Sequence, residues 1–155
     1  ANDRPPSAMQ AWRFSGITAE TGGHAQTLMA LWDDDEWLPV CWVGLIGPDQ
    51  ELAVTLSPMA GRSAGLWRGP SMPAGEAFSV DVAFIPNLGP GGILWRWNES
   101  GPWSSMIGIG AWGIERLPPT AWRSIGHGKR TPNEEAFRGT DLRVEAAPPA
   151  HINAD

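Results

Sequence analysis

Hydrophobic and polar residues alternate with a period of two along most of the chain, the pattern of a half-buried β-strand. The clearest case is residues 76–86, in which alternate positions are large and apolar: Phe78, Val80, Val82 and Phe84. The positions between them are small or polar, so one face of this segment would be buried against a core. The pattern predicts a strand here.

A dense turn signal at residues 87–91, Asn-Leu-Gly-Pro-Gly, follows this strand. A second apolar stretch at residues 92–98 comes directly after it. Two such runs joined by a short glycine-containing loop are typical of a β-hairpin. We therefore predict an antiparallel hairpin from Phe78 to Asn98.

Further short alternating segments, separated by turn formers, predict more strands. They lie at residues 10–17, 26–32, 38–46, 51–56, 65–68, 105–109, 113–117, 122–126 and 141–146. About ten strands at this spacing suit an antiparallel sandwich or barrel.

The composition supports an all-β fold. Nineteen glycines and fifteen prolines interrupt the chain too often for long helices, while 42% of the residues are hydrophobic, which is enough for a folded core. The predicted fold class is all-β: an antiparallel two-sheet β-sandwich of the jelly-roll kind, with little or no helix. A closed β-barrel is the alternative.

The length of 155 residues fits one domain. We expect a single β-sandwich domain at residues 9–147, between loosely ordered segments at residues 1–8 and 148–155, which are polar and carry prolines. The formal charge of −6 provides no basic footprint for nucleic acid. No apolar run approaches the ~20 residues of a membrane span. We therefore expect a soluble protein, either secreted or part of a larger protein or particle.

The stretch from Phe78 to Leu117 resembles the middle of a concanavalin A-like or laminin-G-like jelly roll. The resemblance rests on Phe-Ser-Val-Asp-Val-Ala-Phe, the following Gly-Gly-Ile-Leu-Trp, and a glycine-rich segment at residues 106–114. It covers roughly a quarter of the chain. It implies two curved antiparallel sheets and, frequently, a module that binds glycans or proteins.

Ten tryptophans and no tyrosine give the chain an unusual aromatic content. Indole combines a flat apolar surface with one hydrogen-bond donor, and suits both protein cores and stacking on sugar rings. Trp42, Trp67, Trp95 and Trp112 lie in apolar strand contexts and are expected in the core. Four others lie beside predicted loop tips and are candidate ligand-binding residues: Trp32, Trp37, Trp97 and Trp103.

The densest charge run, Asp33, Asp34, Asp35 and Glu36, lies between two of these tryptophans. Its carboxylates would accept hydrogen bonds from sugar hydroxyls, so we count Asp33, Asp34 and Asp35 as candidate ligand-binding residues, together with Asn98. Crowded carboxylates also suit Ca²⁺, but the alternating ligand spacing of a calcium loop is missing. A solvated hairpin tip is the simpler interpretation of the run.

Catalytic patterns are scarce. The predicted strands carry no carboxylate pair for acid/base hydrolysis of sugars, and the three histidines lack metal-ligand spacing. Residues 108–113 match the dinucleotide pattern G-x-G-x-x-G, but the helix it requires cannot follow. These glycines more simply allow a tryptophan ring to approach closely. The single cysteine, Cys41, is expected to be a small buried hydrophobe.

Three hypotheses follow from these observations. The first is a non-catalytic carbohydrate-binding module that uses tryptophans and carboxylates at loop tips. The second is a structural or assembly subunit, with tryptophans as interface anchors. The third is a β-barrel enzyme or carrier that holds an apolar small molecule in a cavity lined by tryptophan.

Overall fold

The computed structural model describes residues 10–20, 23–32, 41–56, 65–84, 92–97, 102–109, 122–126 and 136–147. These segments contain eleven β-strands and no α-helix. The strands are β1 (Gln10–Ile17), β2 (Gln26–Trp32), β3 (Cys41–Ile46), β4 (Glu51–Leu56), β5 (Gly65–Ser71), β6 (Ala77–Phe84), β7 (Ile93–Trp97), β8 (Ser104–Ser105), β9 (Ile107–Ile109), β10 (Trp122–Ile125) and β11 (Thr140–Ala146).

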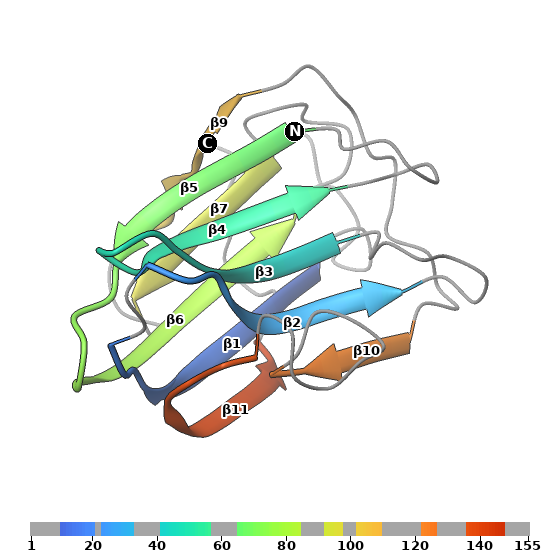
Figure 1. Cartoon of the computed structure of the whole chain (residues 1–155). Helices are drawn as coiled ribbons and strands as arrows, with labels where there is room; N and C mark the ends of the chain where they lie inside the picture. The colour runs from blue at the N-terminus through green and yellow to red at the C-terminus, as the bar shows by residue number, and fades with distance from the viewer. Residues whose placement is uncertain are drawn as a thin grey trace, which may run out of the picture.

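The strands form two antiparallel sheets that stack face to face as a sandwich (Figure 1). The five-stranded sheet has the order β11-β1-β6-β7-β8, and the six-stranded sheet has the order β10-β2-β3-β4-β5-β9. Each sheet has two edges of its own. The predicted sandwich is therefore confirmed, and the closed barrel is not the architecture of this chain.

The core lies between the sheets and follows the predicted alternation. On β6, the apolar residues Phe78, Val80, Val82 and Phe84 all belong to the main cluster of buried side chains. Trp67 of β5 is completely buried in the same cluster from the opposite sheet. Because successive side chains of a strand point to opposite faces, the intervening residues of β6 lie on the outer face of the five-stranded sheet.

The hairpin predicted from Phe78 to Asn98 is confirmed for the strands it joins. β6 and β7 pair antiparallel, with Phe84 opposite Ile93 and Val80 opposite Trp97. The predicted single strand at residues 105–109 is wrong in one respect. It is two short strands, because the chain passes at Met106 from β8 in one sheet to β9 in the other.

Glycine permits close packing where β9 meets β5. Gly108 lies opposite Trp67 in the register of the two strands, and a Cβ atom on Gly108 would overlap the Trp67 indole. The indole thus occupies the space that a larger residue would need. This confirms for Gly108 the prediction that these glycines admit a tryptophan ring, while Gly110 and Gly113 lie outside the described residues.

One end of the sandwich is formed by the turns at residues 47–50 and 72–76, and we call it the turn end (Figure 1). The backbone N–H of Met72 donates to the carbonyl oxygen of Gln50 over 2.9 Å, which links the two turns. Gln50 has a left-handed φ of 49°, which is uncommon outside glycine. Its buried side-chain amide holds this conformation, since its Oε1 accepts a hydrogen bond from Gln26 Nε2 over 2.9 Å.

Candidate functional site

The predicted ligand-binding residues lie only partly in the described structure. Asp33, Asp34, Asp35, Trp37 and Asn98 fall outside the described residues. Trp97 and Trp103 are described with their side chains, and Trp32 through its backbone alone, as the last residue of β2.

Trp32 and Trp97 lie at opposite ends of the sandwich. β7 runs antiparallel to β6, so Trp97 ends β7 close to the turn that precedes Ala77, at the turn end. β2 runs away from the turn end and finishes with Trp32, as Figure 1 shows. Any site that includes Trp97 is therefore separate from a site beside Trp32.

Trp97 combines exposure with a fixed ring. Its residue surface is 40% exposed, which is unusual for so large an apolar side chain. The neighbouring Trp95 ring contacts it edge to face, with centroids 5.4 Å apart and an interplanar angle of 79°. Edge-to-face geometry is a preferred arrangement of aromatic pairs. Trp97 therefore presents apolar surface from a defined position.

The sequence of β7 explains this pair. Trp95 and Trp97 are two residues apart, so both side chains point to the core face of the sheet. Trp95 lies opposite Val82 and packs against the main core cluster. Trp97 is the last residue of the strand, beyond the best-covered part of the core, and part of its ring remains exposed.

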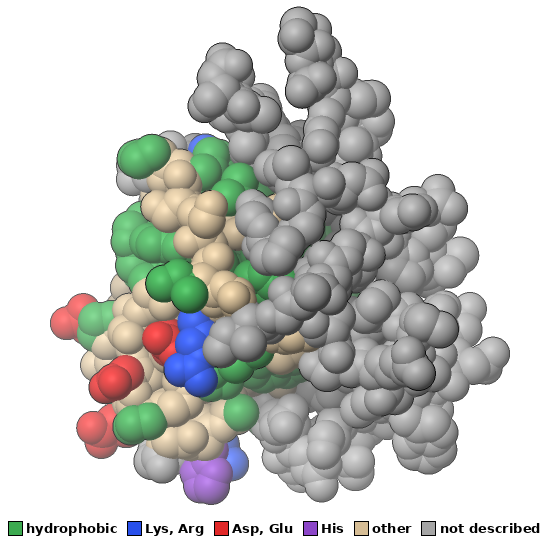
Figure 2. All heavy atoms as spheres, turned by 90° about the horizontal axis from the view of Figure 1, so that it is seen from above, with side chains coloured by type: hydrophobic (Ala, Val, Ile, Leu, Met, Phe, Trp, Pro, Cys, Tyr) green, Lys and Arg blue, Asp and Glu red, His purple; other side chains and the backbone are tan. Residues whose placement is uncertain are grey.

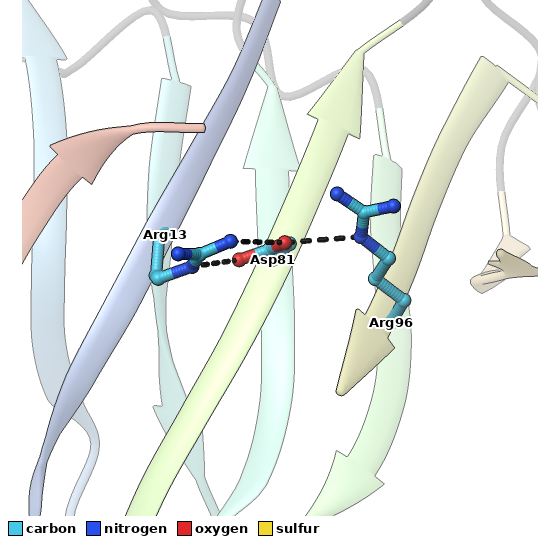
Figure 3. A network of polar contacts seen from close by, with 3 residues as sticks. All are labelled: Arg13, Asp81 and Arg96. Atoms are coloured by element: carbon cyan, nitrogen blue, oxygen red, sulfur yellow. Dashed lines mark hydrogen bonds and ion pairs between the residues drawn. The ribbon is translucent and has the colours of Figure 1, made fainter. Parts of the chain in front are cut away.

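The outer face of the five-stranded sheet carries a buried ion-pair network (Figure 3). Asp81 of β6 is completely buried and lies between Arg13 of β1 and Arg96 of β7. Arg13 donates to both carboxylate oxygens, over 2.8 and 3.1 Å. Arg96 donates through Nε to Asp81 Oδ2 over 3.0 Å. One carboxylate on β6 thus accepts hydrogen bonds from two guanidinium groups, one on each neighbouring strand.

Trp103 extends this network toward the sheet edge. The Arg96 guanidinium carbon lies 4.2 Å from the centroid of the Trp103 ring, a cation–π contact. The ring also packs against a small cluster of buried alanines on this face, formed by Ala11, Ala83 and Ala147. The side chain is therefore half-buried on the outer face, on the opposite face of the sheet from Trp97.

The described residues provide little for catalysis or metal binding. Within them, no group of three or more His, Cys, Asp or Glu side chains could hold a metal ion. Asp81 is the buried carboxylate, and its oxygens are engaged by the two arginines. The Cys41 thiol is completely buried, and this burial raises its pKa far above the usual range, which disfavours the nucleophilic thiolate.

Sequence reasoning missed Arg13 and Arg96 as partners of Asp81. The hairpin register contained a usable signal, because counting back from the turn between β6 and β7 places Asp81 opposite Arg96. No local signal pairs Arg13 with Asp81, since they are 68 positions apart and meet only because β1 lies beside β6.

Among the described residues seen from above in Figure 2, the acidic side chains are spread singly and do not form a patch. Besides Trp97, the large hydrophobic residues exposed in the described part of the chain are Ile17, Ile107 and Ile125. Trp97 is the exposed aromatic among them. In the same part of the chain, no helix is long and apolar enough to cross a membrane.

Neither a protein-family model nor a curated protein sequence matches the chain. The sandwich architecture therefore rests on the arrangement of the strands in the two sheets.

Proposed function

We propose that this chain is a non-catalytic binding module of the concanavalin A-like kind, and that its ligand is a carbohydrate contacted by Trp97. The observation that carries the proposal is that Trp97 is 40% exposed although Trp95 braces its ring. The other described tryptophans whose burial is known are more enclosed: Trp42 and Trp67 are buried, and Trp12, Trp95 and Trp103 are half-buried.

A braced, exposed indole suits sugar recognition for a physical reason. The pyranose ring presents C–H groups that pack on a flat apolar surface, and indole provides the largest such surface of any side chain. A ring that is already fixed loses little rotamer freedom on binding, so more of the contact energy appears as affinity.

The acidic residues predicted beside Trp32 lie outside the described residues, and we do not assign them to the Trp97 site. Residues 33–40 lie between the end of β2 and the start of β3, and Leu31 pairs with Cys41 at the end of the sandwich opposite the turn end. Asp33, Asp34, Asp35 and Trp37 are therefore proposed as a separate contact region for a ligand or for Ca²⁺.

Affinity electrophoresis tests the proposal directly. The protein is run through gels that contain neutral or acidic polysaccharides, once with Ca²⁺ and once with a chelator. At least one polysaccharide should retard the wild type, and Trp97→Ala should weaken its binding at least about tenfold, since buried tryptophan contacts rank among the strongest in interfaces.

Ile125→Ala is the matched control. Ile125 is also 40% exposed, but it lies on β10 at the edge of the six-stranded sheet. This variant should be retarded like the wild type. Equal retardation of Trp97→Ala and the wild type, or no retardation by any polysaccharide, would contradict the proposal.

A further inference from the structure

Arg96 has hydrogen-bond donors that the ion-pair network leaves unused. A guanidinium group carries five N–H donors, and Arg96 uses its Nε–H on Asp81. In Figure 3 the dashed line from Arg96 to Asp81 starts at Nε, and none starts at either terminal nitrogen. Among the described residues, no hydrogen bond engages these two nitrogens. The side chain is 10% exposed, and the two terminal nitrogens remain accessible to solvent.

Trp103 adds a second donor without a partner. Of the solvent-shielded side-chain nitrogen and oxygen atoms in the described segments, Trp103 Nε1 is the one that makes no hydrogen bond. A shielded N–H without an acceptor costs roughly 1–3 kcal/mol, so such groups usually mark a site where a water, an ion or a ligand binds. The ring stacks on Arg96 at 4.2 Å, so both sets of donors belong to one small region.

The charge balance around Arg96 also favours an anion. Asp81 is shared with Arg13, which holds both of its oxygens. Glu145 is the cross-strand neighbour of Arg13 on β11, on the far side of the network from Arg96. Continuing the register of β7 and β8, the neighbour of Arg96 on its other side is Trp103, an aromatic ring and not a carboxylate. The positive charge of Arg96 is therefore only partly neutralised by its described neighbours.

We propose that Arg96 and Trp103 form a binding site for an oxyanion group, a carboxylate or a phosphate, on the outer face of the five-stranded sheet. The anion would accept hydrogen bonds from the terminal nitrogens of Arg96 and from Trp103 Nε1–H. Charge-assisted bonds from a planar guanidinium are among the strongest in proteins. Because Arg96 and Trp97 point to opposite faces of β7, this site is independent of the carbohydrate contact proposed above.

Nuclear magnetic resonance of the indole N–H groups tests the site. The Trp103 Nε1–H signal is identified by its loss in Trp103→Phe. Sodium acetate and sodium phosphate are then titrated at constant pH, with sodium chloride at equal ionic strength as the reference. The signal should shift saturably with at least one oxyanion and not with chloride. Acetate and phosphate distinguish a carboxylate from a phosphate ligand.

Arg96→Gln should weaken the binding at least about tenfold, because it removes both the charge and the terminal donors. Arg68→Gln is the control, since Arg68 is exposed and pairs with Glu51 on the other sheet. If Arg96→Gln does not fold, Arg96→Lys keeps a cation beside Asp81 but loses the planar donors, and it should also bind more weakly. The proposal is overturned if the Trp103 signal is unmoved, follows chloride equally, or responds unchanged in the folded Arg96 variant.

Discussion

Cys41 illustrates how position in the sandwich decides the chemistry of one side chain. It begins β3 and is completely buried in the main cluster between the sheets. An apolar environment penalises the charged thiolate, and the pKa of Cys41 is accordingly raised far above its usual range. The thiol therefore acts as a packing group, as its apolar sequence context predicts.

This burial predicts a specific dependence of stability on pH. Above the ordinary thiol pKa of about 8.5, the unfolded chain releases the Cys41 proton while the folded chain keeps it, so the free energy of unfolding falls by up to about 1.4 kcal/mol per pH unit. Below that pH both states hold the proton and this contribution is constant. Urea unfolding from pH 8 to pH 10 should show this decrease in the wild type and not in Cys41→Ala. Equal slopes in the two proteins would contradict the burial of Cys41.

Asp81 joins three strands of the five-stranded sheet through one buried carboxylate. Its partners Arg13 and Arg96 come from the strands on either side of β6, so the ion pairs act across the register of both pairings. A buried charge is costly unless it is paired, and here the carboxylate and the arginines compensate one another. Removing the carboxylate leaves two cations beside each other on the outer face.

Asp81→Asn should therefore lower the free energy of unfolding by about 3 kcal/mol, the scale observed when one partner of a buried pair is lost. Glu51→Gln is the matched control, because Glu51 pairs with Arg68 at 3.2 Å at the exposed surface. That change should cost less than about 1 kcal/mol. The free energy of unfolding of both variants is measured by urea unfolding. If Asp81→Asn lowers it no more than Glu51→Gln does, the ion pairs of Asp81 do not stabilise the fold as described.

The sequence predicts best those parts of the fold that are formed by residues close together along the chain. The alternation in β6 and the turn signal after it predicted the β6–β7 hairpin, because a hairpin is a local structure. Trp42 shows the limit of this reasoning. It was expected in the core and is indeed buried, but it packs with Ala30 and Ala53 in a separate cluster, apart from its neighbours Cys41 and Val43. An unbroken apolar run does not reveal which face of the strand meets the core.

The candidate site was less predictable than the fold. The position of Trp97 beside a predicted turn is the reason for expecting it at the surface, and in the structure its side chain is partly exposed. Its bracing by Trp95 follows from the two-residue spacing. The separation of Trp97 from Trp32 depends on strand direction within the two sheets, which no local pattern encodes.

At the scale of the whole molecule, the exposed features of the described residues lie at separate places on the two-sheet sandwich. At the turn end, the buried amides of Gln26 and Gln50 hydrogen-bond to each other and fix the turns between strands. Trp97 projects at this end on the core face of β7, while Arg96 and Trp103 lie on the outer face of the same sheet. A binding site held on strands is positioned more precisely than one on loops, which is consistent with the proposed binding module.

Oxidative footprinting of tryptophan, read by mass spectrometry of peptides, tests the proposed carbohydrate contact most directly. The protein is oxidised alone and with the polysaccharide that retards it most in electrophoresis. Trp97 should react readily in the free protein and several-fold more slowly in the complex, while Trp67, which is completely buried, should react slowly in both. If the oxidation rate of Trp97 is the same with and without saturating polysaccharide, Trp97 does not contact the carbohydrate and the proposed function is contradicted.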